Sequence, residues 1–292
     1  MTTIRSIVAA ADFSPGSDAA IERAVQLARA HGASLRLLHA FDVGAWHSLR
    51  GVFDAQRLTM DPPPDVRMRQ RLTELAAALA TRTGIEVEAC FSVGDAHSTI
   101  NAYATAHTPS LVVIGSRAEP AMSGLGGTAS KVLRSPACPI LIVRTADGRP
   151  YDKVLAAVDM REGSVRALSV ALTLFPAAHH HLLYAVEMSL DPLRIVGIAK
   201  AQIRQTLELK HAQASRELQQ LAQRLSGLAV HPVATDVADD VPARAILVRA
   251  AELPADCVVV GHHGEGTIAE SFLGNMAQHV LHHTIRDVLV VP

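Results

Sequence analysis

The sequence predicts an α/β protein made of two tandem, doubly wound domains. Short apolar runs rich in Val, Ile and Leu alternate with stretches of 3.6-residue periodicity, which is the pattern of buried parallel strands joined by helices. This pattern occurs twice, because the segment from Ile7 to Ser17 realigns with the segment from Val154 to Ser164 and keeps its Asp, Gly and Ser. We therefore expect domains over residues 1–146 and 151–292, separated by a break that contains Asp, Gly and Pro.

In the first copy, strands and helices are expected to alternate. The first helix is typical: its apolar positions form one broad face, Gly16 or Ser17 opens it, and Gly32 closes it. Five strands and four helices in this order predict a doubly wound sheet. The strands are expected near residues 5–11, 35–41, 85–91, 111–115 and 139–144, and the helices near 16–31, 65–82, 96–106 and 127–134.

The second copy repeats these elements with one longer helix. An apolar stripe with charged flanks predicts this helix near residues 198–226, long enough to pack beyond its own sheet. In each copy the final strand, 140–143 or 288–291, is apolar and would leave an open sheet edge. Antiparallel pairing of these two strands removes both edges and predicts an intramolecular pseudo-dimer, with a further homodimer left open. Residues 45–65 are read as either a lid or a disordered loop.

Composition limits the partners and the compartment. Of the 292 residues 49% are apolar, and 27 basic side chains face 28 acidic ones for a net charge of −1. These values exclude a disordered chain and give no electrostatic footprint for nucleic acid or an anionic membrane. No uncharged apolar run reaches the roughly 20 residues that a bilayer requires. We expect a soluble, cytoplasmic protein with three reduced core thiols at Cys90, Cys138 and Cys257.

A ligand crevice is expected beyond the carboxyl ends of the strands, where the strand order reverses. Asp12 and Asp159 each end a first strand and either contact a ligand or cap the following turn. In the second copy, glycines at 261, 264 and 274 follow the fourth strand. They would allow a phosphate to approach the backbone at a helix N-terminus, although glycines also simply end strands and start helices.

The whole chain resembles tandem members of the universal stress protein family, in which two family domains are fused. The resemblance rests on the Ala-x-Asp that ends the first strand with a Ser five residues later, the Leu-Leu-His-Ala second strand, and the Gly-x2-Gly-x9-Gly segment. It implies Rossmann-like domains of strand order 3-2-1-4-5, a stress-response role, and ATP or another adenine nucleotide as a ligand that some members bind. The nucleotide-binding residues implied in this chain are Asp159, Val186, Gly261, His262, Gly264, Gly274, Asn275 and Met276.

The two copies depart from the family pattern to different degrees. In copy two, Asn275 replaces a Ser or Thr, but its amide can still donate to a phosphate oxygen. In copy one, Ala118 replaces a glycine, Glu119 adds a negative charge, and the loop before Gly126 or Gly127-Thr128 is one or two residues shorter. We therefore expect copy one to bind triphosphate poorly or not at all, and to serve mainly as a pseudo-dimer partner.

Histidine clusters supply the candidate metal sites of this chain. The candidates for a metal site are residues 179–181, 262–263 and the pair His279 and His283, which share a helix face. No carboxylate or Cys joins them, so we expect surface histidines and no metal site, with residues 179–181 at an exposed strand end. No nucleophile elbow, P-loop lysine or early GxGxxG is present, so we expect no catalysis. Weak ATP hydrolysis is the least favoured function, because no general base or metal-binding carboxylate lies near the glycines in sequence. The alternative function is an interaction scaffold that binds another small ligand or a protein.

Overall fold

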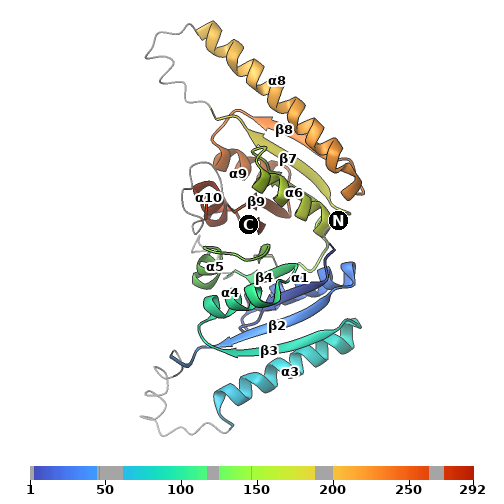
Figure 1. Ribbon diagram of the computed structural model, residues 1–292, viewed down its shortest axis with the longest axis vertical. Coiled ribbons are helices and arrows are strands. Elements are labelled where there is room, and N and C mark those ends of the chain that lie inside the picture. Colours follow the sequence, from blue (N-terminus) through green and yellow to red (C-terminus); the bar gives the residue numbers. More distant parts are fainter. Residues whose placement is uncertain are drawn as a thin grey trace. The chain divides into compact units, whose positions relative to one another are not determined.

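The computed structural model describes residues 3–44, 46, 62–116, 125–145, 147–187, 200–262 and 273–292. The chain divides into two compact units, Thr3–Gly148 and Arg149–Pro292, and each is described by itself (Figure 1). Most of the segment 45–65, with its two interpretations, lies outside the described residues, as do Ala118, Glu119 and Gly264.

The first unit is one parallel sheet in the order β3-β2-β1-β4-β5. The ion pair between Arg82 and Glu22 joins α3 to α1, whereas α4 packs against α5. Right-handed crossovers place these two helix pairs on opposite faces of the sheet. The elements are β1 (Ser6–Ala10), α1 (Pro15–His31), β2 (Ser34–Phe41), α3 (Pro64–Thr83), β3 (Val87–Val93), α4 (Ala96–His107), β4 (Leu111–Gly115), α5 (Gly127–Val132) and β5 (Ile140–Val143).

The second unit repeats this topology, because its strand order β8-β7-β6-β9-β10 is again 3-2-1-4-5 by position in the unit. The predicted fold class is therefore confirmed for both units. The elements are β6 (Lys153–Ala157), α6 (Glu162–Leu174), β7 (His179–Ala185), α8 (Lys200–Leu225), the short 3-10 helix η1 (Ser226–Leu228), β8 (Ala234–Ala238), α9 (Pro242–Glu252), β9 (Cys257–Gly261), α10 (Asn275–His283) and β10 (Asp287–Val291).

Three strands are buried along their whole length, as the continuous Val, Ile and Leu runs predict, and the one charged residue among them is Asp287 at the start of β10. All four residues of β5 and all five of β9 and β10 are buried. The two buried cysteines are Cys138 and Cys257, whereas Cys90 on β3 is only half-buried. All three are free thiols, so the prediction of core thiols is wrong only for the burial of Cys90.

The first helix begins at Pro15, one residue before Gly16 and two before Ser17, so the expectation about its start is wrong. Ser14 is the N-cap, because its side chain accepts from the Ser17 amide at 3.2 Å. Pro15 follows at the first helical position, where a missing N–H costs nothing. The predicted end is correct, since Gly32 closes the helix with a left-handed φ of 62°.

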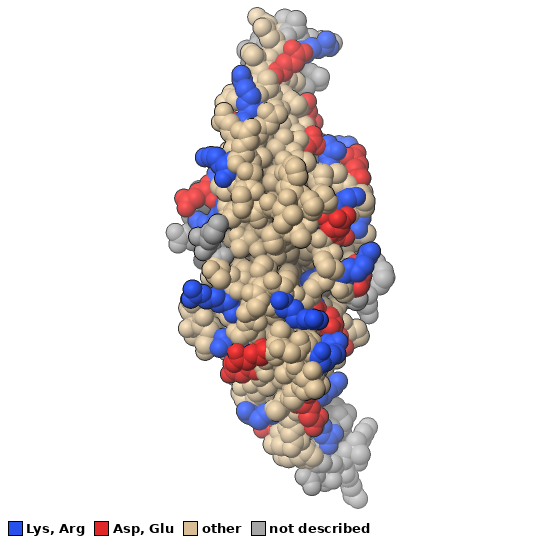
Figure 2. Space-filling view, turned by 90° about the vertical axis from the view of Figure 1, so that its right-hand side faces the viewer, with Lys and Arg blue, Asp and Glu red and all other residues tan. Residues whose placement is uncertain are grey.

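None of the described helices combines the length and apolar character needed to cross a membrane. On the face drawn in Figure 2, blue Lys and Arg side chains are interspersed with red Asp and Glu in each unit. This mixing accords with the nearly balanced charge of the whole chain.

Candidate functional site

Each unit has a cavity at the carboxyl edge of its sheet. In the first unit it measures about 120 Å³ and has an apolar floor that includes Leu38 and Ile100. In the second unit the matching cavity measures about 60 Å³ and is lined by Leu183 and Ile246. Both are smaller than the roughly 300–1,000 Å³ of typical small-molecule pockets.

Asp12 lines the first cavity and stabilises the loop that contains it. Its Oδ1 accepts from the Ser14 amide at 2.9 Å, and its own amide donates to the Ser17 hydroxyl at 3.1 Å. Ser17 Oγ in turn donates to the Ala10 carbonyl at 3.4 Å. The Asp12 carboxylate thus accepts from the backbone two residues later, as Asp does in turns, so the alternative that Asp12 caps the following turn is correct. Asp12 also lines the cavity.

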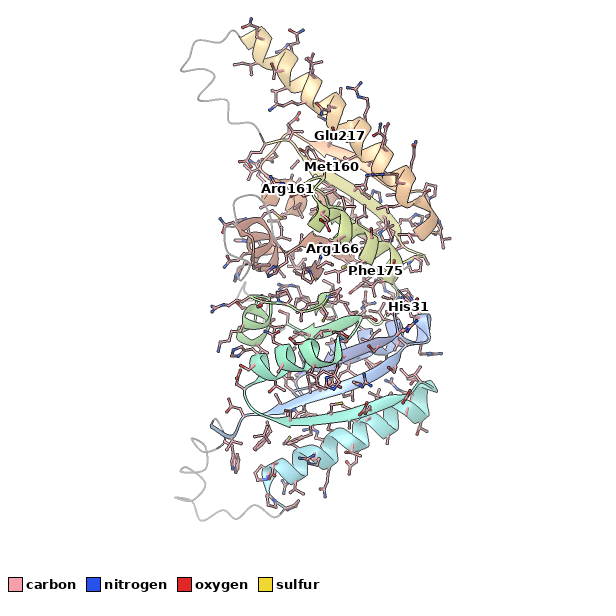
Figure 3. All side chains as sticks on the ribbon, in the orientation of Figure 1. His31, Met160, Arg161, Arg166, Phe175 and Glu217 are labelled. Atoms are coloured by element: carbon pink, nitrogen blue, oxygen red, sulfur yellow. The ribbon has the colours of Figure 1, made fainter. Side chains whose placement is uncertain are left out.

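Asp159 holds the equivalent loop of the second unit more tightly. Its Oδ1 accepts from the Arg161 amide at 3.0 Å and from the Ser164 hydroxyl at 2.6 Å. Arg161 Nε lies 4.0 Å from its other oxygen, and Figure 3 labels Arg161 beside Met160 at the start of α6. Asp159 therefore has more internal partners than Asp12.

Both loops contain one residue with a left-handed backbone directly after the aspartate. Phe13 has φ of 61° and Met160 has φ of 64°, a region that non-glycine residues seldom adopt. Because the strain recurs at the same place with different side chains, it belongs to the loop and not to either side chain. Strain of this kind gathers at ligand-binding loops.

The structure brings together some of the residues assigned to a nucleotide site in the second unit. Asp159, Gly261 and Met276 line the cavity. Gly274 is the N-cap of α10 and Asn275 begins that helix. The remaining described residues, Val186 and His262, are buried and do not line the cavity.

Sequence analysis missed several lining residues, among them Ser164, Pro242 and Ile246. Ser164 could have been found, because Ser17 occupies the same place in the first cavity. Pro242 begins α9 at a position where proline is favoured, so the sequence could also have indicated that a helix starts there.

The first cavity has twice the volume of the second, whereas the glycine pattern favours the second. Gly126, Gly127 and Thr128 line the first cavity at the start of α5. Because Gly126 and Gly274 are the N-caps of α5 and α10, Gly127 is equivalent to Asn275, and the hydroxyl of Thr128 lies one residue further along, at the place of Met276. The expectation that copy one binds triphosphate poorly rests on Ala118 and Glu119 and stays a prediction.

An aromatic cluster that was not foreseen supports the Asp12 loop. The ring of His39 lies 5.1 Å from that of Phe13 and 5.6 Å from that of Phe91. His39 Nδ1 donates to the Ala11 carbonyl at 2.6 Å. From α3, Arg71 stacks over Phe13 at 4.3 Å. In a chain with 3% aromatic residues, this concentration fixes the loop before α1.

Within the described ranges, no group of three or more His, Cys, Asp or Glu side chains is placed to hold a metal ion. The rings of His279 and His283 stack at 4.0 Å, and His283 Nδ1 lies 2.8 Å from the His279 carbonyl. The expectation of surface histidines is wrong for His180, which is 1% exposed, and for His262, which is 2% exposed. The middle residue of the run 179–181 faces the core because successive strand residues point to opposite faces.

The fold and the cavities define a class of α/β protein with two tandem doubly wound units, each with a crevice where its strand order reverses. The universal stress protein family matches residues 3–144 and 150–292, and the chain belongs to this family. The family predicted from the sequence motifs is therefore confirmed.

Relatives share this family membership at moderate identity. A universal stress protein from Mycobacterium tuberculosis is 28% identical over 202 residues, which cover 62% of this chain and 61% of that relative's length. One from Synechocystis is 30% identical over 154 residues, which cover 48% of this chain and 97% of that protein. A functionally unknown protein from Pseudomonas aeruginosa has a similar solved structure, with a TM-score of 0.68 and 22% identity over 99% of this chain and 92% of that one. At this identity the likeness shows a common fold.

Proposed function

We propose that this protein is a non-catalytic stress-response protein that binds an adenine nucleotide, such as ATP, at the carboxyl edge of a sheet. Members of the universal stress protein family can bind adenine nucleotides. The observation that carries the proposal is the repeated Asp and Ser loop, which lines a cavity beside the end of the fourth strand in each unit.

We assign the phosphates to the second unit. Gly274 and Asn275 begin the nine-residue helix α10, whose first amides and positive dipole end suit an anion. Asp159, Gly261 and Met276 line the adjoining cavity. Val186, His262 and Gly264 complete the proposed set of binding residues.

The first cavity is the second candidate location for the nucleotide. It is twice as large, and Thr128 supplies a hydroxyl donor. The competing function, an interaction scaffold without nucleotide, is favoured by the small volume of both cavities. In either case, we propose that the two units act as an intramolecular pseudo-dimer.

Isothermal calorimetry with ATP and ADP tests the proposal. We expect at most one nucleotide per chain, with Gly264→Ala weakening binding more than tenfold and Asp12→Asn leaving it unchanged. Loss of binding in Asp12→Asn but not in Gly264→Ala would move the site to the first unit. The absence of heat at millimolar nucleotide would leave the scaffold function in place.

A further inference from the structure

The second unit contains a buried histidine where the first unit has a leucine. His180 on β7 is 1% exposed, and its Nε2 donates to the Phe175 carbonyl at 2.8 Å. Its Nδ1 has no hydrogen-bond partner among the described residues. When Leu182 is aligned with Leu37, the residue equivalent to His180 is Leu35, which is fully buried on β2.

Other basic groups surround this position. The flanking His179 and His181 project to the opposite face of β7, and His179 stacks on His231 at 4.1 Å. Lys153 on β6, Arg249 on α9 and Asp236 on β8 all act on His181. The carboxylate of Asp236 is already paired with Arg249. On the helix side, Phe175 is the C-cap of α6 and is labelled in Figure 3. Its backbone carbonyl, which carries no net charge, accepts the hydrogen bond from His180.

This arrangement opposes protonation in the folded state. Burial lowers the pKa of His180, the Phe175 carbonyl that accepts its hydrogen bond raises it in part, and the neighbouring His181 and His179 lower it further, so the net shift is downward. Burial and Lys153 likewise lower the pKa of His181. The unfolded chain, with a histidine pKa of about 6.5, then binds more protons than the folded one. Stability is therefore full above that pH and is lost as the pH falls below it.

We propose that the histidine run 179–181 makes the β7 region of the second unit acid-responsive, so that this region opens as the pH falls from 7.5 to 5.5. The matching β2 region of the first unit has Leu35 at this position. Its own histidine, His39, differs from His180 because neither of its ring nitrogens is both buried and without a hydrogen-bond partner among the described residues, so we expect β2 to stay closed. A fall in pH then opens part of the second unit and leaves the otherwise similar first unit closed.

Hydrogen exchange of the full-length protein at pH 7.5 and 5.5, corrected for intrinsic exchange rates, tests this inference. A histidine of ordinary reference pKa that stays fully unprotonated in the folded state at pH 5.5 corresponds to about a tenfold rise in opening, which is the upper limit. We therefore expect protection of peptides from β7 to fall severalfold, by at most about tenfold, and that of peptides from β2 to change less than twofold.

His180→Leu, which copies the first unit, should remove most of the difference and leave only the contribution of His181, and His180→Gln does the same with a polar side chain if leucine packs badly. His283→Gln, an exposed histidine of the same unit, is the matched control and should keep the wild-type response. An equal acid response of β2 and β7, or a full response of β7 in both His180 variants, would overturn the inference.

Discussion

Gly115, at the end of β4, lies against the backbone of Gly16 in the first turn of α1. A Cβ atom on Gly115 would overlap the Gly16 carbonyl, and one on Gly16 would lie 2.5 Å from the Ser116 carbonyl oxygen. In the second unit, a Cβ on Gly261 would lie 3.5 Å from Gly163, which is ordinary contact. The helix that follows the first strand thus approaches the fourth strand more closely in the first unit.

This relationship predicts unequal effects of the same substitution. Gly115→Ala should destabilise the protein by at least about 2 kcal/mol, because two backbone segments must separate. Gly261→Ala, the matched control, should cost less than about 1 kcal/mol. Urea denaturation of both variants measures the difference, and equal midpoints would contradict the close approach.

The repeat and the apolar periodicity were enough to predict the fold, because buried parallel strands need continuous apolar runs. The edge strand β3 is the exception, since it was expected at 85–91 and lies at Val87–Val93. Its residues are only half-buried and include Glu88, so no apolar run marks its ends.

A buried hydrogen bond gives the second prediction. Tyr151 Oη donates to Asp287 Oδ2 at 2.5 Å, and Asp287 is fully buried. Tyr151→Phe removes that donor from a buried carboxylate and should cost about 1–3 kcal/mol. Tyr184→Phe, on β7, is the control and should stay within about 0.5 kcal/mol of wild type. Thermal and urea unfolding provide the comparison; indistinguishable variants would mean that the bond contributes nothing.

The linker segment is held to α1 by a buried arginine. Arg23, 3% exposed, pairs with Asp147 at 3.2 Å, and Gln26 donates to the Gly148 carbonyl at 3.1 Å. Arg23→Met keeps the packing but removes the ion pair, so cleavage by endoproteinase Asp-N before Asp147 should become severalfold faster. Arg29→Met, on the same helix, should leave the rate unchanged. Equal rates in both variants would show that the ion pair does not restrain the linker.

Metal binding gives a prediction carried over from the sequence. Zinc or nickel titration of chelator-stripped protein should reveal no stoichiometric site of sub-micromolar affinity, because two stacked histidines without a carboxylate or thiolate do not complete a metal shell. A tight 1:1 isotherm abolished by His279→Ala would contradict it.

The candidate site was less predictable than the fold. Asp12, Asp159 and the glycines could be recognised because they recur or match a motif. The relative cavity volumes could not, and neither could the closer approach of Gly16 to Gly115, because both units have Gly at these places. The burial of His180 was equally hidden, because a run of three polar residues gives no alternation to read.

The last prediction concerns Asn275 and depends on the proposed nucleotide site in the second unit. Asn275 is exposed at the first position of α10, where the family pattern has a Ser or Thr. Asn275→Ser replaces one neutral donor by another, and a neutral hydrogen bond is worth about 0.5–1.5 kcal/mol. Affinity for ATP should therefore be equal or tighter, by no more than about tenfold. Gln278→Ser, exposed one turn later on the same helix, should not change it. Because a phosphate at this helix start must contact position 275, a large loss of affinity in Asn275→Ser would show that the asparagine amide itself, and not the backbone amides, dominates the contact.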